Sequence, residues 1–138
     1  MKLRAMAKIN LGLDVVKKRE DGYHEVRMIM QTIHMYDQIE LHKSDIVGIH
    51  IKTNLPYLPT GENNLVYRAA KLLMDEYHIT KGLDINLVKF IPVAAGLGGG
   101  SSDAAAVLVG VNRMFGLGLS QKQLEDKGAK IGADVPYC

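Results

Sequence analysis

Residues 92–106 read PVAAGLGGGSSDAAA and join a predicted strand to a predicted helix. Before this stretch, residues 83–88 alternate apolar and polar side chains, as a half-buried strand does. After it, a helix is predicted from Ser102 to about Phe115. Glycines let the backbone turn where a Cβ would clash, so successive N–H groups can converge on an anion. The start of a helix adds unpaired N–H groups and the positive end of the helix dipole. The stretch therefore predicts a phosphate-binding loop.

This loop fits neither of two common phosphate-binding motifs. A Walker A loop needs a lysine directly before its serine or threonine, and none precedes Ser101. A dinucleotide fingerprint would need glycine at position 101 or 103, where serine and aspartate stand. A flexible connection with a Ser-Asp helix cap is the alternative, but the strand-to-helix context favours phosphate. The predicted contacts are Pro92, Val93, Ala94, Ala95, Gly96, Leu97, Gly98, Gly99, Gly100, Ser101 and Ser102.

The rest of the chain predicts a single α+β domain. Strands are predicted over residues 9–15, 26–33, 38–42 and 47–51, with a turn at Asp21-Gly22. A helix is predicted from an Asn64 cap to about Tyr77, because apolar residues recur there at helical spacing. A further helix begins at Ser120, where Gln123 completes a capping box. No linker signal divides these elements.

Composition excludes several classes of protein and site. The 138 residues carry a net charge of +2, which argues against an electrostatic grip on nucleic acid or acidic lipid. The single cysteine excludes an internal disulfide framework and a cysteine-rich zinc site. No two histidines stand at the helical spacing that a metal site favours, and no apolar run approaches a membrane span. We expect a cytoplasmic protein without nucleic-acid or membrane partners.

Four motifs together resemble one family of kinases. Residues 96–105 (GLGGGSSDAA) resemble the second motif of the GHMP kinases. The extra glycines followed by Ser-Ser-Asp resemble the branch that phosphorylates 4-diphosphocytidyl-2-C-methyl-D-erythritol. Residues 7–11 (AKINL), 21–24 (DGYH) and 132–136 (GADVP) match the same branch in the same order. The four motifs are spread over nearly the whole chain, and their occurrence together is more specific than any one of them alone.

The resemblance implies a fold and a catalytic pair. The fold would be the GHMP kinase N-terminal lobe, like domain 2 of ribosomal protein S5, with a mixed sheet and helices packed on one face. Lys8 would lie by the transferring phosphate, where phosphoryl transfer needs positive charge. Asp134 would orient or deprotonate the acceptor hydroxyl and form a charge pair with Lys8. Read alone, Lys8 is a solvated lysine at a strand edge, and Asp134 is a turn aspartate.

The same resemblance assigns ligand contacts and cofactors. ATP and Mg²⁺ are implied, with Ser102 as a candidate contact of the metal. Asn10, Tyr23 and His24 would bind the acceptor substrate, 4-diphosphocytidyl-2-C-methyl-D-erythritol. The nucleoside of ATP would be reached by Asn64 and Lys89. Read alone, Tyr23 and His24 belong to a surface turn, Asn64 is a helix cap and Lys89 is a strand-end charge.

The resemblance also raises a question about completeness. By this resemblance, residues 1–138 would be the GHMP kinase N-terminal, ATP-binding domain, and we expect the family's C-terminal domain to be absent from this chain. We therefore expect weak or absent turnover by this chain alone and self-association through uncovered apolar surface. Another GHMP kinase, of the homoserine or mevalonate type, is a rival, disfavoured by residues 21–24 and the triple glycine. A non-catalytic S5-like module that binds nucleotide or RNA is a second rival, disfavoured by the low net charge.

Overall fold

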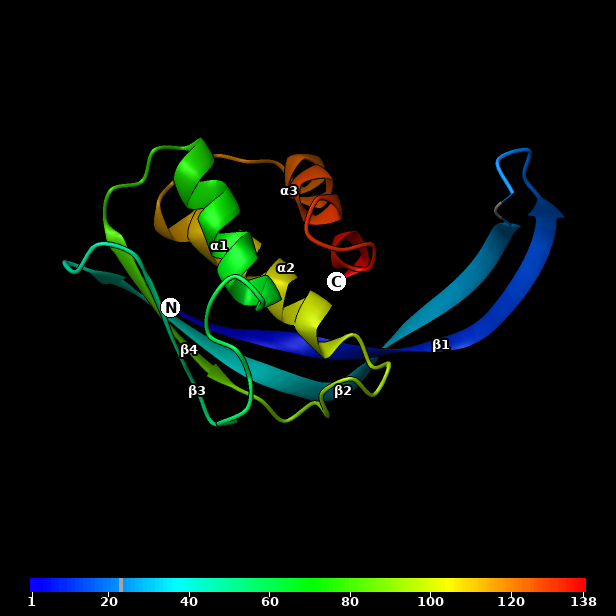
Figure 1. Cartoon of the computed structure of the whole chain (residues 1–138), viewed down its shortest axis with the longest axis horizontal. Helices are drawn as coiled ribbons and strands as arrows, with labels where there is room; N and C mark the ends of the chain where they lie inside the picture. The colour runs from blue at the N-terminus through cyan, green and yellow to red at the C-terminus, as the bar shows by residue number, and fades with distance from the viewer. Residues whose placement is uncertain (23) are drawn as a thin grey trace.

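The sheet and helices form two layers. The computed structural model describes residues 1–22 and 24–138. Within them, the elements are β1 (Lys2–Lys18), β2 (His24–Ser44), β3 (Ile49–Thr53), α1 (Leu65–Glu76), β4 (Gly82–Val88), α2 (Gly99–Met114), α3 (Gln121–Ala129) and the 3-10 helix η1 (Val135–Tyr137). The strand order is β1-β2-β4-β3, with β3 parallel to β4 and the other pairs antiparallel. The helices lie on one face of this sheet (Figure 1), so the predicted α+β class and one-sided mixed sheet are confirmed.

The core lies between the sheet and helices α1 and α2. In β4, Leu83, Ile85 and Leu87 are buried while the residues between them are exposed. This alternation places one apolar face of the strand against the helices. Buried apolar residues recur at helical spacing on one face of each helix. They are Val66, Ala69, Ala70 and Leu73 in α1, and Ala104, Val107, Leu108 and Val111 in α2. These side chains hold α1 and α2 against the sheet.

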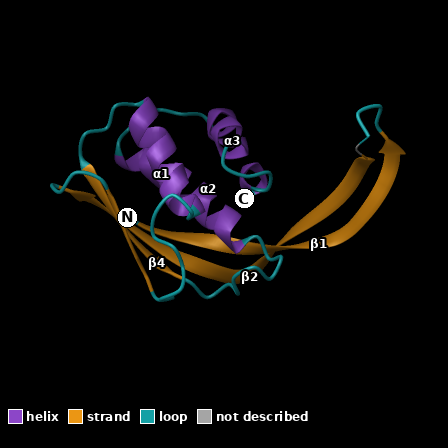
Figure 2. Ribbon diagram, viewed as in Figure 1, coloured by secondary structure: helices purple, strands orange, loops and turns teal. Residues whose placement is uncertain are grey.

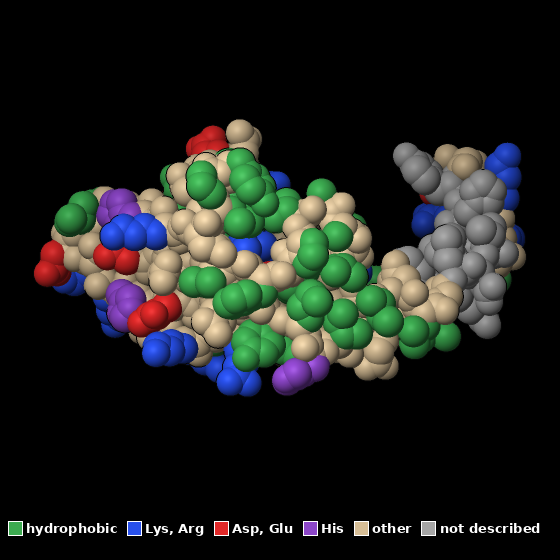
Figure 3. All heavy atoms as spheres, turned by 90° about the horizontal axis from the view of Figure 1, so that it is seen from below, with side chains coloured by type: hydrophobic (Ala, Val, Ile, Leu, Met, Phe, Trp, Pro, Cys, Tyr) green, Lys and Arg blue, Asp and Glu red, His purple; other side chains and the backbone are tan. Residues whose placement is uncertain are grey.

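A two-stranded arm projects from this body. β2 pairs with β4 only over Gln38–Ser44, so its earlier part pairs with β1 alone. That part of the hairpin extends beyond the helices and bends toward the side of the sheet on which they lie (Figure 2). Three register shifts interrupt the pairing of β1 with β2, and such bulges bend a strand. Leu11 and Ile29, one on each strand, are 60% and 63% exposed. Apolar side chains also gather on the uncovered side of the sheet toward the arm (Figure 3).

Several predicted boundaries were wrong. The strand predicted over residues 9–15 extends over Lys2–Lys18, because β2 pairs with it along that length. Residues 26–33 and 38–42 belong to one long strand, because β1 continues the pairing between them. β3 begins at Ile49 and not at Val47, since Gly48 has a φ of +109° and Val47 is 79% exposed. α2 begins at Gly99 and not at Ser102, because the left-handed turn at Gly98 precedes it directly. The starts of α1 and α3 agree with the predicted caps at Asn64 and Ser120.

No helix within the described residues is both long enough and apolar enough to cross a membrane.

Candidate active site

The glycine-rich loop ends at the exposed start of α2. β4 ends at Val88, and residues 92–98 carry the chain to Gly98, the N-cap of α2. Gly98 has a φ of 69°, which reverses the chain directly into the helix. The first turn of an α-helix leaves its N–H groups without acceptors inside the helix. In α2 this turn consists of Gly99, Gly100 and Ser101, and the first intrahelical bond runs from Ser102 N to Gly98 O at 2.9 Å. The backbone N–H groups of these three residues are thus available to an anion.

A hollow of about 400 Å³ lies in front of these amides. Its wall consists of the loop, the start of α2, the segment before α1, the end of β4 and three charged residues: residues 92–101, Leu58, Pro59, Asn63, Asn64, Leu65, Leu87, Lys89, Asp103 and Asp134. Ten of the eleven predicted phosphate contacts therefore border one space. Ser102, the eleventh, is only 4% exposed and borders a neighbouring hollow that also contains Lys8 and Cys138. Its assignment to the metal ion stays a prediction.

Lys8 of β1 lies against the loop with both its backbone and its side chain. Its N–H donates to Leu97 O at 2.9 Å, which ties β1 to the loop. A Cβ added to Gly98 would stand 2.6 Å from Lys8 Cε and 2.8 Å from Lys8 Cγ. The aliphatic stem of Lys8 therefore lies so close to the loop that only glycine fits at position 98 without a shift of the lysine or the loop. The lysine is 8% exposed, so its ammonium group is held in a nearly fixed place.

The ammonium group of Lys8 faces a carboxylate from the other end of the chain. Lys8 Nζ lies 3.3 Å from Asp134 Oδ2. Asp134 stands at the N-cap of η1, and its side chain is 46% exposed. The predicted charge pair between Lys8 and Asp134 is thus present. Asp134 borders the hollow that the loop lines, and Lys8 borders the neighbouring hollow. A buried cation beside an accessible carboxylate can stabilise a transferring phosphoryl group and receive a proton from its acceptor.

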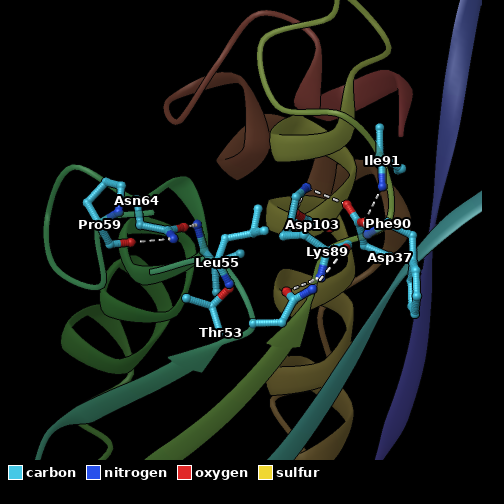
Figure 4. A network of polar contacts seen from close by, with 11 residues as sticks. Asp37, Thr53, Leu55, Pro59, Asn64, Lys89, Phe90, Ile91 and Asp103 are labelled. Carbon is cyan, nitrogen blue, oxygen red and sulfur yellow. Dashed lines mark hydrogen bonds and ion pairs between the residues drawn. The ribbon is translucent and has the colours of Figure 1, made fainter. Parts of the chain in front are cut away.

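A second lysine lies beneath the loop inside a buried ionic network (Figure 4). Lys89 Nζ contacts Asp37 Oδ2, and it lies 2.7 Å from Asp103 Oδ2. All three side chains are at most 5% exposed. Both acceptors of the Lys89 ammonium group are therefore internal. Lys89 borders the hollow, yet its charge is already engaged, and its predicted contact with the nucleoside stays a prediction.

Burial shifts the pKa values within this network. Desolvation raises the pKa of Asp103 to about 7, although the Lys89 ammonium group opposes the shift. For Lys89, desolvation lowers the pKa of the ammonium group. The attraction of Asp103 and then of Asp37 outweighs this effect, so the pKa of Lys89 is raised. Asp103 Oδ1 is buried without a hydrogen-bond partner. A carboxyl group with one unpartnered buried oxygen is costly to ionise, consistent with that direction.

The remaining predicted contacts lie in different places. Asn64 borders the hollow, but its side chain accepts from Val66 N at 2.8 Å and donates to Pro59 O at 2.8 Å, as a helix cap does. Asn10 is exposed on β1, two residues beyond Lys8. Tyr23 lies outside the described residues. His24 opens β2 opposite Lys18, and its side chain is not among those described.

Sequence reasoning missed Asp37 as a residue of this site. Asp37, Ile39 and Leu41 alternate along β2 and are all buried, so the aspartate shares the apolar face of the strand. A charged residue in register with a buried apolar face requires an internal partner. That register is a signal in the sequence, but it does not reveal that the partner is Lys89, 52 residues away.

Comparisons with known proteins identify relatives of this chain. Residues 64–138 match the family model described as the GHMP kinases N terminal domain. The chain is 54% identical over 138 residues to the 4-diphosphocytidyl-2-C-methyl-D-erythritol kinase of Lachnospira eligens, covering 100% of this chain and 48% of that protein. It is 58% identical over 136 residues to the kinase of the same name from Lachnoclostridium phytofermentans, covering 99% and 47%. The chain thus spans about half the length of these curated relatives.

The solved structures that resemble this chain include a kinase named for the same compound as its sequence relatives. A crystal structure of 4-(cytidine 5'-diphospho)-2C-methyl-D-erythritol kinase aligns with a TM-score of 0.86 and 39% identity, over 99% of this chain and 48% of that one. The Methanococcus jannaschii mevalonate kinase aligns with a TM-score of 0.72 at 19% identity, over 95% of this chain and 45% of that one. The second similarity concerns the fold alone.

Proposed function

This chain belongs to the GHMP kinase family, and on that premise we propose that it is the ATP-binding domain of a kinase. The acceptor would be the 2-hydroxyl of 4-diphosphocytidyl-2-C-methyl-D-erythritol, and the product its 2-phosphate, an intermediate of non-mevalonate isoprenoid synthesis. The observation that carries the proposal is the Lys8–Asp134 pair, 3.3 Å apart, whose carboxylate borders the glycine-loop hollow and whose lysine borders the neighbouring one. The relatives at 54% and 58% identity carry the name of this kinase, which supports the choice of acceptor.

The proposed mechanism uses backbone amides to hold the polyphosphate. The N–H groups of Gly99, Gly100 and Ser101 would donate to phosphate oxygens, aided by the positive end of the α2 dipole. Glycine at 99 and 100 leaves no side chain between those amides and the ligand. The size of the hollow and its backbone lining fit a polyphosphate chain.

Lys8 and Asp134 would act at the reacting atoms. Lys8 Nζ would stand beside the γ-phosphoryl group and stabilise the charge that develops on its oxygens. Asp134 would orient the acceptor hydroxyl and take its proton while the new O–P bond forms and the bond to ADP breaks. Transfer would be direct, without a covalent enzyme intermediate.

Mg²⁺ would enter with the nucleotide. Among the described residues, no three His, Cys, Asp or Glu side chains form a group able to hold a metal ion. The ion would therefore be held largely by phosphate oxygens and water, as Mg²⁺ commonly is, with a serine hydroxyl of the loop as its protein contact. Its contribution would be to neutralise the charge of the polyphosphate.

A chimera tests the proposed reaction. Residues 1–138 are joined to the part of the Lachnospira eligens kinase that lies beyond its match to this chain, and ADP release is measured with three acceptors. We expect turnover with 4-diphosphocytidyl-2-C-methyl-D-erythritol and little with homoserine or mevalonate. Equal turnover with homoserine or mevalonate would refute the proposed acceptor. We expect the 138-residue chain alone to bind MgATP but to turn over weakly or not at all.

We also propose cytoplasmic localisation and self-association of the isolated chain. The exposed apolar side chains of the arm, Leu11 and Ile29, support association, because contiguous apolar surface is normally covered. Sedimentation velocity over a hundredfold concentration range tests it, with Ile29→Lys as the variant. A dimer that the variant dissociates agrees with the proposal, and a monomer at every concentration contradicts it.

A further inference from the structure

The junction between β4 and the glycine loop is held by side chains rather than by strand pairing. β4 ends at Val88, so the next three amides have no neighbouring strand to bind. Lys89 N donates to Asn54 Oδ1 at 2.7 Å, and Asn54 Nδ2 donates back to Lys89 O at 3.0 Å. Phe90 N and Ile91 N donate to Asp37 Oδ1 at 2.6 and 2.8 Å. All three consecutive amides therefore have a side-chain acceptor.

Asp37 occupies the centre of this arrangement. Its second oxygen contacts the ammonium group of Lys89, so one carboxylate accepts two backbone bonds and one ion pair. Asp37 is 0% exposed and lies on β2, a strand of the rigid sheet. Hydrogen bonds to a buried carboxylate are stronger than those between neutral groups. The junction is thereby fixed to the sheet at three points.

Lys89 carries this constraint from the junction to the start of α2. Its ammonium group also lies 2.7 Å from Asp103 Oδ2, and Asp103 belongs to the second turn of the helix. A Cβ added to Gly99 would stand 3.1 Å from Lys89 Nζ and 3.0 Å from Ile91 Cγ2. The first residue of α2 therefore rests directly on the junction. A displacement of Lys89 or Ile91 would move the amide of Gly99.

We infer that Asp37 is a positioning residue of the phosphate-binding loop: it holds residues 89–91 and, through them, the amides at the start of α2. This inference rests on the proposed function, because the proposed function assigns a polyphosphate ligand to those amides. Asp37 does not line the hollow, so it would act on the ligand through other residues.

The test compares three variants of the 138-residue chain. Asp37→Asn keeps the shape of the side chain but removes the charge that binds Lys89. Asn54→Ala releases the same junction without altering the ionic network. Asp45→Asn is the matched control, since Asp45 is exposed and forms its ion pair with Lys81, a surface residue. Circular dichroism establishes the temperature at which each variant is fully folded.

Two measurements follow on each folded variant. Amide ¹H–¹⁵N spectra are recorded without ligand, and binding of MgATP and of inorganic tripolyphosphate is measured by calorimetry. For Asp37→Asn we expect the amides of residues 96–100 to shift together with those of Phe90 and Ile91. We expect both ligands to bind about tenfold more weakly, the equivalent of one hydrogen bond with lost geometry. Asn54→Ala should act in the same direction, and Asp45→Asn should change neither measurement.

The outcomes separate this inference from the proposed function. Asp37→Asn overturns the inference if only the amides of residues 90 and 91 shift while both affinities stay unchanged. Should Asp37→Asn not fold, Asn54→Ala decides by the same criteria. If the unaltered chain binds neither ligand, the proposed function fails, and the ligand-free amide shifts still decide whether Asp37 positions the loop.

Discussion

Replacing Gly98 by alanine tests the contact between the loop and Lys8. Gly98 has a φ of +69°, a conformation that side chains disfavour, and its missing Cβ leaves room for the stem of Lys8. The added methyl group would stand 2.6 Å from Lys8 Cε, closer than real Cβ atoms approach other carbons. Gly98→Ala must therefore move Lys8, the loop or both.

The expected magnitude has two contributions. The left-handed conformation costs alanine about 1–2 kcal/mol. Moving the stem of Lys8 off its preferred rotamers adds about 1 kcal/mol. Gly116→Ala isolates the first contribution, because Gly116 has a φ of +61° and nothing lies within 4 Å of its added Cβ. We therefore expect Gly98→Ala to lower the free energy of unfolding by about 1 kcal/mol more than Gly116→Ala does.

Urea unfolding and MgATP calorimetry measure the two effects. Because the loop and Lys8 Nζ both move in Gly98→Ala, we expect MgATP affinity to fall by at least about tenfold. Gly116 lies outside the hollow, so Gly116→Ala should leave the affinity unchanged. If both variants lose the same stability and both retain the affinity of the unaltered chain, then the close approach of Lys8 to the loop has no part in binding.

Three further predictions concern the catalytic pair, the ionic network and the core. In the chimera, Lys8→Met should lower kcat by about a hundredfold or more with less effect on KM, because Lys8 is proposed to act on the transferring group; an unchanged kcat in a rate assay would contradict its role. The pKa of Asp103 is raised to about 7 in the folded chain, whereas the unfolded chain loses this proton near pH 4. The contribution of Asp103 to stability therefore falls as the pH rises from about 4 to about 7. Urea unfolding at pH 4.5 and 7.5 should therefore show Asp103→Asn gaining stability relative to the unaltered chain at the higher pH, and a constant difference would contradict the raised pKa. Leu73→Ala should lower the free energy of unfolding by about 2–5 kcal/mol, since Leu73 is 0% exposed in the core; thermal unfolding that stays within 1 °C of the unaltered chain would show that the helix layer is not packed as described.

Local signals in the sequence predicted the elements that local interactions form. Asn64 begins α1 and Ser120 begins α3 because each side chain caps its own helix within three residues. The start of α2 was misjudged because Gly98 provides a left-handed turn without a side-chain cap. A serine pair following glycines resembles a cap, but the helix had already begun three residues earlier.

Long-range contacts were beyond what local patterns can predict. The Lys8–Asp134 pair was expected only through the resemblance to a family, since 126 positions of chain separate Lys8 from Asp134 and no periodicity links them. The contacts of Asp37 with residues 89–91 depend on which strands are neighbours in the sheet. Sheet order arises from the packing of the whole domain, so a reading of individual segments does not determine it.

A crystal structure of the 138-residue chain with Mg²⁺ and a non-hydrolysable ATP analogue would show whether the start of α2 binds the polyphosphate. We expect polyphosphate oxygens within hydrogen-bond distance of the amides of Gly99, Gly100 and Ser101, with the γ-phosphate beside Lys8 Nζ. A polyphosphate bound away from the start of α2, with Lys8 and Asp134 facing only each other, would contradict it.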